Sequence, residues 1–182
     1  MTIDLDQLSV FGLLTMLAVA IYFDIRTERI PNWLVAAGTV VALTLHAVSS
    51  GALGLLTSVG GLSIAMVILL PFYIAGVMGA GDVKLMAAVG AFTGMPLALL
   101  TVGFALGVGV LEAIAILVLR GTGRQTWERY RQMGRTILAT GRVVYIRPGQ
   151  GDAAGESFPF AIAIGVGTIS SLLSTGSMEP QL

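Results

Sequence analysis

The chain has no cysteine and a single histidine, and charged residues make up only 11% of its 182 residues. Without cysteine it can form no disulfide, no thiolate zinc site and no cysteine nucleophile. The scarcity of charge comes with 55% hydrophobic residues and a mean hydropathy of +0.90, which is far outside the range of a water-soluble domain of this length. The composition therefore predicts an integral membrane protein with the lipid bilayer as a partner.

Six apolar runs are candidates for helices that cross the bilayer, which takes about 20 apolar residues. They lie at residues 8–23, 33–48, 55–75, 83–92, 97–119 and 158–173. The fourth is short for a span, so we expect it either to tilt or to be partly re-entrant, with the turn at residues 93–96 buried among its neighbours. The sequence thus predicts an all-α integral membrane protein, a polytopic bundle of about six transmembrane helices forming one domain over residues 1–182.

The basic residues indicate how these helices are oriented, because all ten fall in alternate loops. They are Arg26 and Arg29 in the first loop, Lys84 in the third, and Arg120, Arg124, Arg129, Arg131, Arg135, Arg142 and Arg147 in the fifth. By the positive-inside rule these loops are cytoplasmic and both termini lie outside. Asp4 and Asp6 precede the first run where a signal peptide would be basic, so we expect that run to be retained.

Two carboxylates, Asp24 at the end of the first run and Asp82 before the fourth, are both predicted at the cytoplasmic side. Asp82 fits a helix N-cap that follows turn glycines, and Asp24 fits the polar end of a helix. Ionisable groups near a membrane are nevertheless candidates for function. Two carboxylates held close share one proton and so provide an acid and a base. Such a pair can activate water against a peptide bond without metal or cofactor, as aspartic proteases do.

Three segments carry a family resemblance. "GAGD", residues 79–82, fits the Gly-Xaa-Gly-Asp signature of membrane-embedded aspartic proteases, and "DIRTERIPN", residues 24–32, resembles the first-aspartate segment of type IV prepilin leader peptidases. "PFAIAIGVG", residues 159–167, is similar to the entry into their last helix, with Ala161 where the family usually has glycine. The Pro-Ala-Leu motif of presenilin and signal peptide peptidase is absent from the sequence.

The resemblance implies that Asp24 and Asp82 are the catalytic pair. It implies supporting roles in the motifs or in substrate binding for Gly79, Gly81, Pro31, Asn32 and Pro159. Pro31 and Asn32 would fix the start of the second helix. The two glycines before Asp82 would let an extended substrate backbone approach closely, because they present no side chain.

The implied substrate is a prepilin or pseudopilin whose basic leader is cut at the cytoplasmic face of the inner membrane of a prokaryote. Many members of the family also methylate the new N-terminus with a region that carries paired Cys-Xaa-Xaa-Cys motifs. Because this chain has no cysteine, we expect a peptidase without methyltransferase activity, as in compact members that serve Flp-type pili or archaeal pilins. We expect no cofactor, metal or nucleic acid as a partner, and the oligomeric state stays open.

Other polar features leave alternatives open. The basic loop at residues 120–157 has the pattern of an amphipathic helix on an anionic membrane surface, and it either sets topology on the headgroups or contacts the substrate specifically. Glu112 either shapes the site or makes a structural hydrogen bond. His46 is interpreted as an interfacial residue at the outer end of the second run, and Lys84 as a topology anchor.

The rival function is a non-enzymatic membrane transporter or a pilus or secretion assembly factor with structural carboxylates. Carboxylates that transport ions tend to lie near the midplane of the bilayer, whereas Asp24 and Asp82 are predicted at one edge. That difference in position favours the peptidase.

Overall fold

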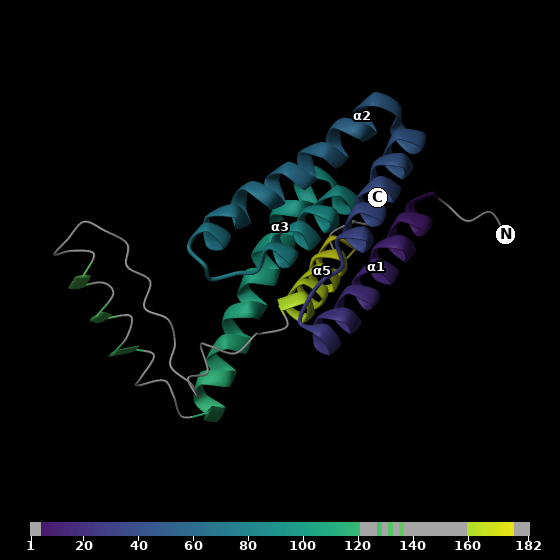
Figure 1. Ribbon diagram of the computed structural model, residues 1–182. Coiled ribbons are helices and arrows are strands. Elements are labelled where there is room, and N and C mark those ends of the chain that lie inside the picture. Colours follow the sequence, from purple (N-terminus) through teal and green to yellow (C-terminus); the bar gives the residue numbers. More distant parts are fainter. Residues whose placement is uncertain (1–4, 121–126, 129–130, 133–134, 137–159, 177–182) are drawn as a thin grey trace. The chain divides into compact units, whose positions relative to one another are not determined.

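The computed structural model describes residues 5–120, 127–128, 131–132, 135–136 and 160–176, and all regular structure in these residues is helical. The elements are α1 (Leu5–Thr27), α2 (Asn32–Ile74), α3 (Ala80–Arg120) and α5 (Phe160–Gly176) (Figure 1). Three of them are long and apolar enough to cross a bilayer, and α5 is a shorter apolar helix. The described residues are all-helical, as predicted, and their apolar helices are consistent with a membrane protein, while the prediction of about six spans stays a prediction. Pro159 and most of the 120–157 loop lie outside the described residues.

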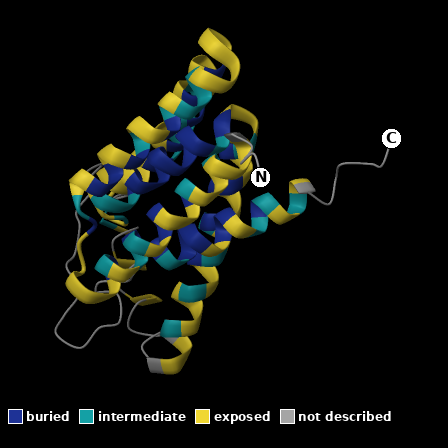
Figure 2. Cartoon of the chain, turned by 90° about the vertical axis from the view of Figure 1, so that its right-hand side faces the viewer, coloured by how far each residue is buried: buried dark blue, intermediate teal, exposed yellow. Residues whose placement is uncertain are grey.

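The chain divides into two compact units. The first contains α1, α2, α3 up to Gly109, and α5, and the second begins at Val110 with the rest of α3. The buried core belongs to the first unit and gathers where its helices meet (Figure 2). Both candidate aspartates also lie in the first unit.

A break at Ser50 and Gly51 divides α2 into two halves. Gly51 has a φ of 59° and a ψ of −138°, a conformation that glycine adopts without steric cost. The chain changes direction there (Figure 1), and Gly54 comes so close to the carbonyl of His46 that a Cβ at residue 54 would overlap its oxygen. The break falls between the predicted helices 33–48 and 55–75.

A second break, at Gly94, divides α3 between the predicted helices 83–92 and 97–119. Pro96 has no N–H to donate, so the carbonyl of Phe92, four residues earlier, lacks its usual helical partner. Side chains of α2 donate to two carbonyls beside the break. The Ser58 hydroxyl donates to the Ala91 oxygen at 2.8 Å, and Nε2 of His46 lies 2.9 Å from the Phe92 oxygen.

These contacts correct two expectations. His46 is not simply an interfacial residue, because its ring nitrogen bonds to a backbone oxygen exposed by the break in α3. In the predicted buried turn, Gly94 is buried and Thr93 half-buried, but Met95 and Pro96 are exposed. The turn is therefore buried only on the side where α2 supports it.

The first half of α3 is the most enclosed segment of the described chain. From Val83 to Phe92 every residue except Lys84 is buried. Gly90 and Gly61 of α2 approach so closely that a Cβ on either would overlap the carbonyl oxygen of the other. Small residues at helix contacts of this kind let backbones pack closely in membrane proteins. A helix enclosed by other helices in this way need not match the thickness of the bilayer, which explains how the fourth apolar run can be short.

Candidate active site

Asp24 lies in the last turn of α1 and is 8% exposed. The helix ends three residues later, and Glu28 then adopts a left-handed φ of 52° while its N–H still donates to the Asp24 carbonyl at 2.9 Å. The Thr27 hydroxyl donates to the Phe23 carbonyl at 2.8 Å. The end of the helix is therefore locally defined, and it holds the Asp24 side chain on the buried side.

The Asp24 carboxylate accepts a hydrogen bond from α5. Its Oδ2 lies 3.2 Å from the backbone nitrogen of Ala161, the second residue of that helix. The first N–H groups of a helix have no partner inside the helix, and the helix dipole adds partial positive charge at this end. The buried carboxylate is thus placed where a helix stabilises an anion.

The turn that leads to Asp82 begins with a tightly bonded helix end. At the end of α2 the Gly76 N–H donates to the Tyr73 carbonyl and the Val77 N–H to the Phe72 carbonyl, both at 2.9 Å. Gly76 has a φ of 72°. This is the Schellman arrangement, in which a left-handed residue satisfies the last carbonyls of a helix. It fixes how the chain turns from α2 toward α3.

Asp82 is the third residue of α3 and not its N-cap, which corrects the simplest interpretation of the sequence. Its Oδ2 accepts a hydrogen bond from the N–H of Gly79, the residue before the helix, at 3.2 Å. This is the half of a capping box in which an acidic side chain at the third helical position bonds back to the N-cap backbone. Asp82 is half-buried, so its carboxylate is oriented but accessible.

The two motif glycines differ in what surrounds them. A Cβ on Gly79 would lie 3.0 Å from Oδ2 of Asp82, so the absence of a side chain protects the capping bond. A Cβ on Gly81 would lie 3.4 Å from the Cβ of Ile30, which is an ordinary contact. The fold therefore does not require glycine at residue 81. That this glycine makes room for a substrate backbone stays a prediction.

The two aspartates lie 58 positions apart in the sequence, each near a helix end, yet their carboxylates lie within electrostatic range of each other. Glu28 lies within the same range of Asp24. Each aspartate uses Oδ2 for a backbone hydrogen bond, and within the described residues neither Oδ1 accepts one. The arrangement can therefore hold two carboxylates in fixed orientations with one oxygen of each available for a proton or a water molecule.

A contact that the sequence did not reveal joins the start of α2 to the start of α3. The Lys84 ammonium group donates a hydrogen bond to Oδ1 of Asn32 at 3.0 Å. Asn32 is the first residue of α2 and follows Pro31, whose carbonyl accepts the N–H of Leu34 at 3.1 Å. The first residue of α2 and the fifth residue of α3 are thus linked close to Asp82 in the sequence. The only signal in the sequence is that Asn32 ends one motif segment and Lys84 lies two residues after another, and that signal does not pair them.

Glu112 belongs to the second unit, where its Oε2 is buried without a hydrogen-bond partner among the described residues. The described part of the chain also contains no group of three or more histidine, cysteine or acidic side chains that could hold a metal ion.

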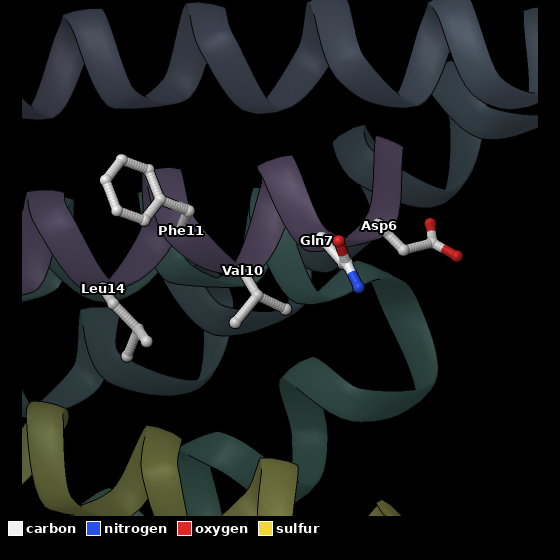
Figure 3. Close-up of a pocket in the computed structure, with 5 residues that line it drawn as sticks. All are labelled: Asp6, Gln7, Val10, Phe11 and Leu14. Carbon is white, nitrogen blue, oxygen red and sulfur yellow. The ribbon is translucent and has the colours of Figure 1, made fainter. Parts of the chain in front are cut away.

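Two hollows lie at the other end of α1. One of about 450 Å³ is lined by Asp6, Gln7, Val10, Phe11 and Leu14 (Figure 3). Another of about 400 Å³ is lined by side chains that include Asp6, His46 and Thr57. Asp24 is ten residues beyond Leu14 on the same helix, which corresponds to about 15 Å. Neither hollow is therefore part of the aspartate site.

A family model matches residues 11–117 of the chain, and it is that of the type IV leader peptidase family. The match contains Asp24, the α1–α2 connection and Asp82, and it ends before α5. No curated protein and no solved structure matches the chain.

Proposed function

The chain belongs to the type IV leader peptidase family, and on this premise we propose that it is a membrane-embedded aspartic endopeptidase. Its substrates are type IV or Flp-type prepilins or pseudopilins, from which it removes the basic leader peptide. The observation that carries the proposal is the pair formed by Asp24 and Asp82. These carboxylates come from the end of α1 and the start of α3, interact electrostatically, and are each oriented by a backbone N–H.

The pair supports a mechanism in which the two carboxylates share one proton. The ionised carboxylate takes a proton from a water molecule as its oxygen attacks the scissile carbonyl. The protonated carboxyl group polarises that carbonyl and then gives its proton to the leaving nitrogen. Because one oxygen of each carboxylate is held by a backbone donor, the other can face the water and the substrate without rotating freely.

The location we propose is the inner membrane of a prokaryote, with the pair at the cytoplasmic face, both termini outside and about six spans. Support comes from the breaks at Gly51 and Gly94. Each break lies at a predicted loop and divides α2 or α3 into two halves. Support also comes from the alternation of basic loops along the sequence. Asp24 and Asp82 lie at helix ends, unlike carboxylates that bind transported ions at mid-membrane helix breaks.

We further propose that the protein has no N-methyltransferase activity. The chain contains no cysteine, whereas the methylating members carry paired Cys-Xaa-Xaa-Cys motifs in an additional cytoplasmic region. The connection between α1 and α2, where such a region would lie, consists of residues 28–31 alone.

The direct test is to co-express the chain with a candidate prepilin and to follow loss of the leader by mass spectrometry. We expect Asp24→Asn and Asp82→Asn each to lower the cleavage rate by at least about 100-fold, the lower range for removing a general acid or base. Asp6→Asn is the matched control, because Asp6 is an exposed aspartate in the first turn of the same helix as Asp24. It should cleave like wild type.

Wild-type rates in both site variants, with insertion verified, would rule out the aspartic mechanism. If wild type cleaves none of the prepilins encoded with it, the non-enzymatic rival gains support. A methylated pilin N-terminus made by this chain alone would contradict the proposed lack of methyltransferase activity.

A further inference from the structure

The hydrogen bond between Asp24 and Ala161 joins residues 137 positions apart. The donor lies in α5, which is outside the segment matched by the family model. Ala161 is fully buried, with an exposed fraction of 0%, so water cannot easily replace either partner. A buried N–H that loses its acceptor costs appreciable free energy. Among the described residues, the Asp24 carboxylate is the acceptor of this N–H.

The packing of α5 on α1 keeps the two groups together. Gly165 lies one helical turn after Ala161, and a Cβ there would lie 2.9 Å from the Cδ1 of Ile21. Ile21 lies almost one turn before Asp24 on α1. Residues four apart lie on the same face of a helix. The face of α5 that carries Ala161 is therefore in close contact with the face of α1 that carries Asp24.

The bond has a directional consequence for the carboxylate. Asp24 has two rotatable side-chain bonds, and a fixed donor on Oδ2 removes much of that freedom. Oδ1 then has a defined position relative to Asp82, whose own Oδ2 is held by Gly79. Small misplacements of reacting groups can cost about 100-fold in rate.

We propose that the backbone N–H of Ala161 is a positioning group, through which α5 holds the Asp24 carboxylate in its reactive orientation. This inference rests on the proposed function, because the orientation matters only if Asp24 takes part in the reaction. It assigns to α5 a role that does not depend on the identity of the side chain at residue 161.

The test removes the N–H and keeps the side chain. Ala161 is replaced by L-lactic acid through nonsense suppression, which converts the backbone amide into an ester, and the purified protein is assayed in nanodiscs on a prepilin. We expect kcat to fall about 10- to 100-fold, as for loss of a hydrogen bond to a charged group, with KM within about twofold. The matched control is the corresponding ester at Ile162, the next residue in the same helical turn, which should keep wild-type kcat.

A second readout does not require activity. The shift in the thermal unfolding midpoint caused by the Ala161 ester is measured in wild type and in Asp24→Ala. If the hydrogen bond is present, the ester lowers the midpoint in wild type and changes it much less when the acceptor is already missing.

The outcomes separate the two proposals. Wild-type kcat in the Ala161 ester, or an equal loss in the Ile162 ester, overturns the positioning role. If the midpoint shifts show that the ester and Asp24→Ala are coupled but kcat does not change, the positioning role is overturned and the proposed peptidase function stands. If the midpoint shifts show this coupling but the wild-type protein cleaves no prepilin, the proposed function is overturned and the positioning role with it.

Discussion

Lys84 shows how much a single contact changes the interpretation of a residue. From the sequence it is a topology anchor two positions after Asp82, where the side chains of a helix diverge. In the structure its ammonium group bonds to Asn32 and so connects the second turn of α3 to the first turn of α2. Since Asp82 lies two positions before Lys84 on the same helix, the link restrains the helix that carries one of the two carboxylates.

We predict that Lys84→Met lowers kcat/KM for prepilin cleavage about 3- to 10-fold, because an exposed hydrogen bond contributes roughly 0.5–1.5 kcal/mol. Asn32→Ala should have a similar effect, and the double variant should be little worse than either single one. Lys84→Arg keeps a donor and a positive charge and serves as the control. Fully additive losses would show that the two residues act independently.

At the scale of elements, α2 and α3 are joined by hydrogen bonds and by a close approach of their backbones. Ser58 and His46 bond to the carbonyls of Ala91 and Phe92 beside the break in α3, and Gly61 contacts the backbone at Gly90. The break is tolerated because side chains of the neighbouring helix donate hydrogen bonds to the backbone there. The two helices therefore determine each other's shape, and a side chain placed between them has no space to occupy.

Gly90→Ala should accordingly destabilise the protein by about 2 kcal/mol or more, since its Cβ would overlap the Gly61 carbonyl and overpacking costs about 1–3 kcal/mol. Gly103→Ala in the same helix is the matched control, because no atom lies within 4 Å of the added Cβ. Its stability should stay equal or rise by about 0.5–1 kcal/mol through helix propensity. Unfolding in detergent, followed by circular dichroism, measures both, and equal stabilities would contradict the close approach.

For the whole molecule, the central question is how many times the chain crosses the membrane. The breaks in α2 and α3 coincide with predicted loops that carry no basic residue, while the α1–α2 connection carries Arg29 and Lys84 follows the α2–α3 connection. If each half of a broken helix crosses once, both breaks face outside and both connections face the cytoplasm.

Because the chain has no cysteine, single cysteines can test this arrangement without background. We expect Ser50→Cys and Met95→Cys, both at exposed positions next to the breaks, to react with a membrane-impermeant maleimide added to intact cells. Val77→Cys, in the exposed connection between α2 and α3, should react only after the membrane is permeabilised. Labelling of residue 77 from outside, or protection of residue 50, would contradict the six-span topology.

The sequence by itself determined the class of the protein and the identity of the candidate pair. Apolar runs and charge distribution are properties of composition and order, and they predict apolar helices whatever the partners of those helices are. Asp24 and Asp82 were recognisable because each lies in a short motif beside a helix end. The turns at Gly51 and Gly94 fell between predicted helices, because glycine marks breaks locally.

Only the tertiary structure decided how that pair is held. Asp82 lies inside its helix and not at the cap, because the helix begins at Ala80, and boundaries of this kind vary by a few residues in sequence-based assignment. The partners Ala161 for Asp24, Asn32 for Lys84 and Ser58 for the carbonyl of Ala91 lie 137, 52 and 33 positions away. Hydrogen bonds over such separations depend on how helices pack, and no spacing or periodicity in the chain encodes them.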